Sequence, residues 1–283
     1  MPVKHKHNPT KARLGKELHW AASFRASASR PAGVASAVLA ADLDRTRLVR
    51  CVAVSLTLDR PLALSELLAE TIRLYGQRFG AAVGIGIPIG GAFLATLVTP
   101  TAVDVVIIAL AFTGSYAAAA RVAAGDPLAE AWAQTGLRLP TLLVLALVVA
   151  VPFALAVTQL YLFLLAVAWL GLMGFSIPVA MLEQDPEAKT WFDRLGYTLF
   201  RSVSLARAEY LHAIGISAAL VIVYVVLGIV LAATLVGFAD NGRAIAVAIA
   251  QVILAPLFFL GLSVLYFEQK VRALSSRPAK PPT

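Results

Sequence analysis

Few side chains in this sequence have the type and spacing that catalysis or metal binding requires. His5 and His7 stand close together, but in a basic stretch without a helix or strand period, so they lack the preformed cage of a metal site. The sequence has no G-x-S-x-G elbow, P-loop or H-E-x-x-H pair, which carry common nucleophilic, phosphate-binding and zinc chemistry. We therefore expect no enzyme activity, no cofactor and no metal.

Ionisable residues are rare inside the long apolar stretches, where a buried charge is costly and often functional. Asp104 stands at the edge of one stretch, beside a Thr-Pro-Thr turn. We interpret it as a solvated helix start, with an ion or proton site as the alternative. His212 begins another stretch close to Glu209. A lone histidine at such a place lacks the converging groups of a catalytic base.

Two uncharged polar residues, Tyr224 and Gln251, lie well inside apolar stretches. They could line a solute path, or they could satisfy each other by hydrogen bonding. Prolines could kink the helices around such a path; they are Pro88, Pro152, Pro178 and Pro256. Ion-coupled transporters usually bury charges along the path, and these stretches do not. A transporter or lipid-handling protein is therefore the alternative to a non-catalytic membrane protein.

The longest apolar stretch, residues 139–182, has 44 residues without a charge or a histidine. As one helix it would be about 66 Å long, roughly twice the 30 Å hydrocarbon core of a bilayer. It must therefore cross a membrane twice, turning at Thr158, Gln159 and Tyr161. The composition agrees, because 59% of the residues are hydrophobic and 14% charged, against roughly 45–50% and 25% in soluble domains.

We predict an all-α, polytopic integral membrane protein with six transmembrane helices in three hairpins. In the first span, Gly86 and Gly90 are spaced to clear one helix face for a close neighbour, as are Gly80 and Gly84. The expected spans are residues 80–98, 102–120, 139–157, 162–182, 211–238 and 244–267.

An amphipathic segment precedes each hairpin, within residues 60–78, 121–138 and 183–210. We expect interfacial helices there, lying in the headgroup region, and the recurring unit suggests a tandem threefold repeat over 61–120, 127–182 and 186–267. Ser65, Asp126 and Asp185 are the expected N-caps. The predicted apolar faces are Leu64, Leu67, Leu68, Ile72, Tyr75 and Phe79 in the first helix, Leu128, Trp132 and Thr135 in the second, and Trp191, Phe192, Leu195, Leu199 and Val203 in the third.

Aromatic and basic side chains share these segments, as is typical of a membrane interface. We therefore place the functional surface on the amphipathic helices, as an accessory or scaffold module whose partners are the lipid bilayer and a protein at the cytoplasmic face. The candidate interfacial residues are Arg73, Trp132, Arg138, Trp191, Arg194 and Arg201, and the candidate intramembrane polar residues are Tyr224 and Gln251.

Basic residues predict the orientation. With both termini cytoplasmic, 23 of the 24 Lys and Arg lie inside and only Arg243 lies outside, as the positive-inside rule favours. The net charge of +8 thus reflects topology and anionic headgroups, not nucleic acid. We expect residues 1–57 to be a disordered basic segment or to precede the true start, residues 58–273 to be the membrane domain, and residues 274–283 to be a disordered basic tail.

The stretch Arg60-Pro-Leu-Ala-Leu-Ser-Glu-Leu-Leu, followed by Ile72-Arg-Leu-Tyr and Phe79-Gly, resembles the opening of membrane domains related to the glycerophosphoryl diester phosphodiesterase membrane domain. Pro178-Val-Ala-Met-Leu-Glu and the stretch from Ala255-Pro256 to Val271-Arg272 agree with it. Some relatives carry a soluble phosphodiesterase barrel. Such a barrel needs about 250 residues, which this sequence does not have beside the membrane domain, so we do not expect the phosphodiesterase activity here. Relatives without the barrel imply a bacterial plasma-membrane protein.

Overall fold

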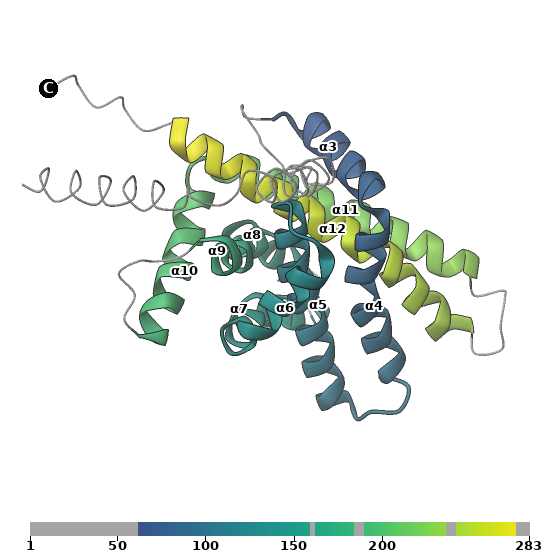
Figure 1. Ribbon diagram of the computed structural model, residues 1–283. Helices are drawn as coiled ribbons and strands as arrows, with labels where there is room; N and C mark the ends of the chain where they lie inside the picture. Colours follow the sequence, from purple (N-terminus) through teal and green to yellow (C-terminus); the bar gives the residue numbers. More distant parts are fainter. Residues whose placement is uncertain (1–61, 159–161, 184–189, 236–241, 276–283) are drawn as a thin grey trace, which may run out of the picture. The chain divides into compact units, whose positions relative to one another are not determined.

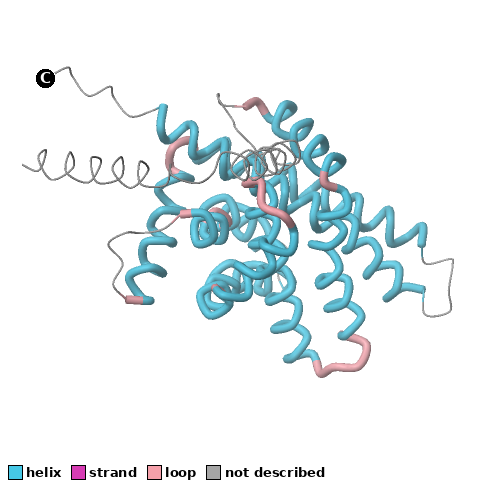
Figure 2. The backbone as a smooth tube through the Cα atoms, in the orientation of Figure 1, coloured by secondary structure: helices cyan, strands magenta, loops and turns pink. Residues whose placement is uncertain are grey.

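The computed structural model describes residues 62–158, 162–183, 190–235 and 242–275, and these residues form helices without any strand (Figures 1 and 2). The prediction of an all-α chain is therefore confirmed for this part. In chain order the helices are α3 (Leu64–Gln77), α4 (Phe79–Ala95), α5 (Thr101–Ala123), α6 (Leu128–Leu137), α7 (Leu139–Thr158), α8 (Leu162–Met173), α9 (Ser176–Leu182), α10 (Trp191–Ala206), α11 (Tyr210–Leu235) and α12 (Gly242–Ser275).

Three helix pairs contain the apolar stretches. Helices α4 and α5 are joined by a short loop and pack side by side (Figure 1), α7 packs against α8, and α11 packs against α12. Helix α7 ends at Thr158 and α8 begins at Leu162, so the long stretch is divided at the predicted turn. Residues 159–161 themselves lie outside the described part.

The apolar segment after that turn is broken between Met173 and Ser176. Pro178 explains the break, because it has no N–H to donate to the carbonyl of Gly174 and its ring crowds that carbonyl. The expected kink at Pro178 therefore appears about one turn earlier in the chain than the proline itself.

Sharp bends separate two amphipathic helices from the apolar helices that follow them. The angle between α3 and α4 is 92°, and the angle between α6 and α7 is 85°. Each bend occurs at one arginine, Arg78 or Arg138. Helices α3 and α6 therefore run nearly perpendicular to the next helix. In the third unit, residues 207–209 separate α10 from α11.

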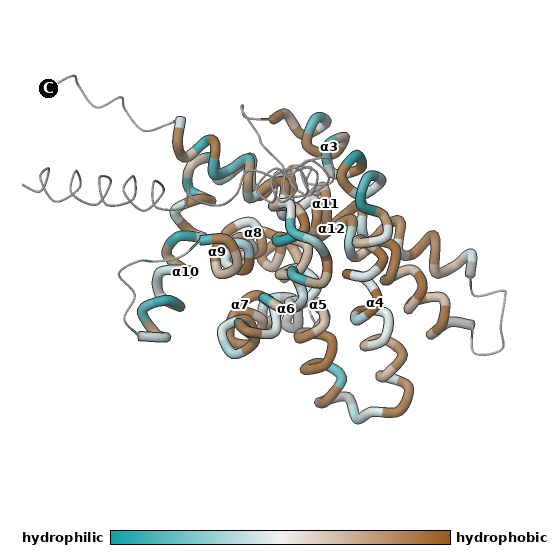
Figure 3. The backbone as a smooth tube through the Cα atoms, viewed as in Figure 1, coloured by the Kyte–Doolittle hydropathy of each residue, from teal (hydrophilic) through white to brown (hydrophobic). Residues whose placement is uncertain are grey.

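Four segments of the described chain are long and apolar enough to cross a membrane, or up to six if each bent pair counts as one span. Figure 3 shows hydrophobic residues along α4, α5, α11 and α12, while α3, α10 and the C-terminal part of α12 carry hydrophilic ones. The four segments are Val103–Ala123, Leu162–Leu182, Tyr210–Thr234 and Ala244–Ser275.

Close packing of α4 against α12 depends on one of the predicted glycine pairs. A Cβ added to Gly86 would lie 2.1 Å from the Val252 carbonyl oxygen, and one on Gly90 would lie 3.0 Å from the Ala248 carbonyl oxygen. This pair confirms the expected close approach. A Cβ added to Gly80 would have no neighbour within 4 Å. Gly80 and Gly84 therefore do not together form a contact face for another helix.

The buried face of α3 differs from the predicted stripe. Leu67, Thr71 and Leu74 are buried, whereas Leu64 and Ile72 are 42% and 63% exposed. The hydroxyl of Thr71 donates to the Leu67 carbonyl at 2.8 Å, which satisfies it within the packed face. Leu68 and Tyr75 are half-buried against the core. The predicted apolar face of α3 is therefore only partly the packing face, and Leu64, Ile72 and Phe79 stay exposed.

Helix α10 shows the same division. Thr198, Ser202 and Leu205 are buried, while Phe192 and Phe200 are 74% and 75% exposed. The Ser202 hydroxyl donates to the Leu172 carbonyl at 2.8 Å, so small polar residues let α10 approach α8 closely. In α6 the packing agrees better with the prediction, because Thr135 is buried and Leu128 and Trp132 pack on the core.

Two expected N-caps are wrong. Helix α3 begins at Leu64, so Ser65 lies inside its first turn, and the Ala63 N–H donates to the Glu66 carboxylate at 3.1 Å instead. Pro127 occupies the N-cap position of α6, while Asp126 forms an ion pair with Arg121 at 2.6 Å. Asp185, the third expected cap, lies outside the described residues.

Helix α12 extends beyond the expected end of the sixth span at residue 267 and reaches Ser275. The predicted tail 274–283 therefore begins with two helical residues. The rest of that tail, and the whole of segment 1–57, lie outside the described residues.

Candidate functional site

The start of α10 is fixed by a reciprocal cap. The Thr190 hydroxyl accepts a hydrogen bond from the Asp193 N–H at 3.1 Å, and the Thr190 N–H donates to the Asp193 carboxylate at 2.9 Å. This capping box sets the first turn of the helix. Residues 194, 197, 198 and 201 then share one side by their spacing of three and four.

A pocket of about 300 Å³ lies between α7, α9 and α10. Two arginines and three hydroxyl-bearing side chains make it polar. Its lining consists of Arg138, Thr141, Ala180, Glu183, Arg194, Tyr197 and Thr198.

Arg138 reaches this pocket from the bend between α6 and α7. Its guanidinium donates to the carbonyl of Ala180, near the C-terminal end of α9, where a cation is favourable. Burial lowers the pKa of Arg138, and the charges of Arg121 and Arg194 lower it further. The site therefore brings like charges close together.

Glu183, directly after α9, binds several polar side chains at the edge of the pocket. Its carboxylate accepts hydrogen bonds from Arg201 Nε at 2.9 Å and from the Tyr266 hydroxyl at 2.7 Å, and Lys270 Nζ lies 3.2 Å away. Burial alone would raise the pKa of Glu183, but the hydrogen bonds from Arg201 and Tyr266 and the charges of Lys270 and Arg201 outweigh it, so the pKa lies below its usual value.

Trp191 does not line the pocket itself, but its indole N–H donates a hydrogen bond to the hydroxyl of Thr141, a lining residue, at 3.0 Å. Four of the six predicted interfacial residues therefore converge here: Arg138 and Arg194 in the pocket lining, Trp191 through Thr141, and Arg201 through Glu183. Sequence reasoning missed the role of Glu183, for which the only signal was a carboxylate directly after a long apolar stretch.

The other two predicted residues lie elsewhere. Arg73 is exposed on α3, where it pairs with Glu70 and donates to Gln77 Oε1 at 3.1 Å. Trp132 packs over Gly114 of α5, at 3.5 Å from the position of an added Cβ. The tryptophan thus covers a helix of this chain, and the structure does not bring either residue to the pocket.

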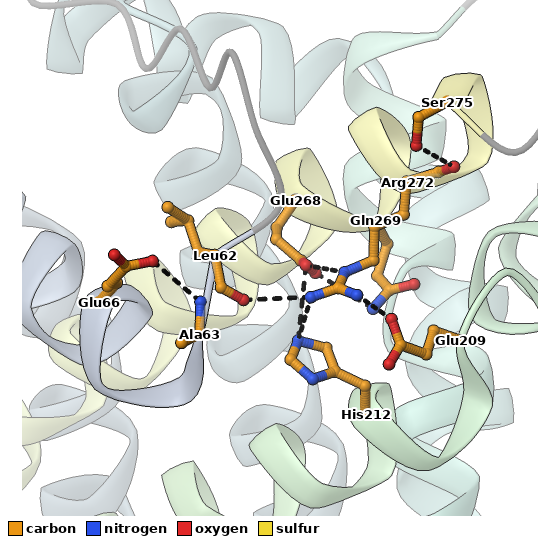
Figure 4. A network of polar contacts seen from close by, with 9 residues as sticks. All are labelled: Leu62, Ala63, Glu66, Glu209, His212, Glu268, Gln269, Arg272 and Ser275. Carbon is orange, nitrogen blue, oxygen red and sulfur yellow. Dashed lines mark hydrogen bonds and ion pairs between the residues drawn. The ribbon is translucent and has the colours of Figure 1, made fainter.

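A second polar cluster, not predicted from the sequence, centres on Arg272 (Figure 4). Its guanidinium donates to the carboxylates of Glu268 and Glu209 and, at 3.1 Å, to the Leu62 carbonyl. His212 Nε2 lies 3.4 Å from the Glu268 carboxylate. The cluster joins the chain just before α3 to the start of α11 and the end of α12. Its sequence signal was the i, i+4 spacing of Glu268 and Arg272.

The two intramembrane candidates do meet. The Tyr224 hydroxyl donates to Gln251 Oε1, and the Tyr224 ring lies 5.2 Å from the ring of Phe258. This geometry fits the interpretation in which the two polar groups satisfy each other. Asp104, at the start of α5, accepts a hydrogen bond from the Thr99 hydroxyl of the preceding turn.

Among the described residues, no group of three or more His, Cys, Asp or Glu side chains could hold a metal ion. No family model, no curated protein and no solved structure matches this chain.

Proposed function

We propose that this chain is a six-span integral membrane protein that acts without catalysis, as an accessory or scaffold module, through amphipathic helices at the cytoplasmic face. In this proposal α3, α6 and α10 are interfacial helices, both termini are cytoplasmic, and the location is a bacterial plasma membrane. The resemblance to glycerophosphoryl diester phosphodiesterase membrane domains belongs to the same proposal, without the catalytic barrel.

The bends of 92° and 85° are the observation that carries the proposal. A span lies close to the bilayer normal, so a helix nearly perpendicular to it lies along the membrane plane. An amphipathic helix in that plane can place its apolar side in the acyl boundary and its charges in water. The bends therefore favour two spans that each follow an interfacial helix over two single broken spans.

Uncovered apolar side chains on the same helices support this placement. Ile72 of α3 and Phe192 and Phe200 of α10 are 63%, 74% and 75% exposed. In water such side chains would be unfavourable, whereas the headgroup boundary or a partner would cover them. Exposed apolar side chains also line the candidate spans, as lipid contact requires, and in this proposal those of α3 and α10 add a surface at the membrane boundary.

A transporter remains the second candidate, and the observation that favours it is an apolar pocket between α3, α11 and α12, lined in part by Tyr224 and Phe258. That pocket measures only about 50 Å³, whereas small-molecule sites measure roughly 300–1,000 Å³. The Tyr224 hydroxyl donates to Gln251, so these two polar groups bond to each other and not to a solute. The scaffold function is the better supported of the two.

One pair of assays separates the candidates. Phe200→Ser alters the exposed face of α10, and the double variant Tyr224→Phe, Gln251→Leu removes the intramembrane polar pair. Under our proposal, a protein partner cross-links to the wild type and to the double variant in native membranes, is lost with Phe200→Ser, and proteoliposomes show no solute flux. Flux that the double variant abolishes and Phe200→Ser leaves unchanged would establish the transporter instead.

A further inference from the structure

We propose that the pocket between α7, α9 and α10 binds a phosphate group, with Arg138 and Arg194 as its charged ligands. The inference deepens the proposed function, on which it rests for the position of the pocket at the membrane surface. The phosphate could belong to an anionic lipid headgroup or be free in solution, and both sources share this chemistry.

Charge is the first argument. Arg138 and Arg194 both line the pocket, and the charge of Arg194 acts on Arg138 strongly enough to lower its pKa, after burial and the charge of Arg121. Within the described residues, neither arginine forms an ion pair with a carboxylate. A bound anion would relieve this repulsion, since it would bring opposite charge to both guanidinium groups.

The one carboxylate in the lining does not oppose an anion. Glu183 faces Arg201 at 2.9 Å and Lys270 at 3.2 Å, so two cations neutralise its single charge. The pocket and its immediate partners therefore contain four cationic side chains and one carboxylate among the described residues. The surplus is positive, as phosphate binding requires.

Hydrogen-bond donors are also available in the lining. Arg138 uses part of its guanidinium for the Ala180 carbonyl, but a guanidinium has five N–H groups in a planar fork that suits phosphate oxygens. Thr141 accepts its hydrogen bond from Trp191, so its own O–H remains able to donate into the pocket. Charged forks and a hydroxyl thus line one space.

The size and polarity fit a headgroup or a free phosphate better than a whole lipid. The volume of about 300 Å³ lies at the low end of the roughly 300–1,000 Å³ of small-molecule sites. Arginine also binds phosphate in a bidentate manner, which gives geometric as well as electrostatic selectivity. A single phosphate group held between the two arginines satisfies both conditions.

The test is calorimetric titration of the full-length protein in a neutral maltoside detergent, with two probes used separately: dihexanoyl phosphatidylglycerol and sodium phosphate. We expect saturable one-site binding of at least one probe. Arg194→Gln removes one charge from an exposed side chain and should weaken that binding about tenfold, whereas Arg194→Lys should restore part of it. Arg138→Gln is the less specific test, because Arg138 also donates to the Ala180 carbonyl near the end of α9 and its loss could alter the fold as well as binding.

Arg73→Gln is the matched control, since it removes an exposed arginine of another amphipathic helix; its affinity should stay within twofold of the wild type. Binding of the lipid alone would identify a headgroup, and binding of both probes would show that the phosphate group suffices. Absence of binding, or an equal loss with Arg73→Gln, overturns the inference. Such a failure leaves the partner assay on Phe200 unaffected, because that residue does not line the pocket.

Discussion

At the residue scale, Glu183 joins two helices to the end of a third through one carboxylate. Arg201 reaches it from α10, Tyr266 and Lys270 reach it from α12, and Glu183 itself follows α9. Its side chain is only 10% exposed, so this charge is favourable only because its partners are present. Without the carboxylate, two cations would face each other across the same space.

We expect Glu183→Gln to destabilise the protein by about 1–3 kcal/mol, because charged hydrogen bonds are lost and two cations remain. The pKa of Glu183 is lowered from 4.5 in the folded chain, so the contribution of its charge is fully present above that usual value. It disappears as the pH falls through the lower folded pKa. Unfolding in detergent micelles, followed against pH for both proteins, measures the difference.

Glu70→Gln is the control for this prediction. Glu70 pairs with Arg73 on the surface of α3, where the arginine is 46% exposed, and such pairs contribute about 0–1 kcal/mol. A loss for Glu70→Gln equal to that for Glu183→Gln, or a Glu183 effect that grows as the pH falls below 4.5, would contradict the assignment.

The composition of the candidate site was largely readable from the sequence, but its geometry was not. Arg138, Trp191, Arg194 and Arg201 could be selected because charges and aromatics gather in the amphipathic segments. Their meeting around Thr141 and Glu183 depends on which side of α10 packs inward. That choice follows from tertiary contacts of small polar residues, which hydrophobic periodicity does not detect.

At the element scale, the contact between α4 and α12 requires a missing side chain. Gly86→Ala would place a Cβ 2.1 Å from the Val252 carbonyl oxygen and 2.7 Å from its carbon, so the two helices must separate. We expect a loss of about 1–3 kcal/mol, as for other overpacked sites, measured by unfolding in mixed micelles.

Gly91→Ala provides the comparison, since nothing lies within 4 Å of the added Cβ. Alanine is the better helix former by about 1 kcal/mol, so this variant should be neutral or slightly more stable than the wild type. Equal destabilisation by the two substitutions would show that helix propensity, and not the contact with α12, controls this region.

The amphipathic helices could be anticipated, but their uncovered faces could not. The 3.6-residue period predicts an apolar side; it does not say which part packs on the protein and which part meets lipid. In α10 the packed face contains Thr198 and Ser202, and Phe192 is left 74% exposed. The packed face of α10 is therefore displaced from the predicted apolar stripe, and part of that stripe stays exposed.

Spin labels on α10 can test this division, after Cys51→Ser removes the single native thiol. Positions 192 and 204 are both exposed and differ by about a third of a turn around the helix. We expect a label at Phe192→Cys to collide more with oxygen, which dissolves in lipid, and one at Ser204→Cys to collide more with a water-soluble nickel complex. Equal water accessibility at both positions would contradict an interfacial α10.

At the scale of the whole molecule, α12 connects the described helices. It packs against α3, α4, α5, α10 and α11, and its C-terminal end carries the Arg272 cluster. The sequence predicted an apolar helix here correctly. It did not predict the extension past residue 267, because a charged segment near a membrane boundary can be either helix or tail, and here contacts with Glu209 and Leu62 favour the helix.

Orientation of the whole chain is the central claim, because every proposed surface depends on which side of the membrane it faces. Substituted cysteines in the Cys51→Ser background should report it with an impermeant thiol reagent. We expect labelling in intact cells of cysteines placed near Thr101, Gln159 and Asn241, and labelling only after lysis of cysteines placed near Gly125 and Lys189. The reverse pattern, or labelling of both groups from the same side, would contradict six spans with interfacial helices at the cytoplasmic face.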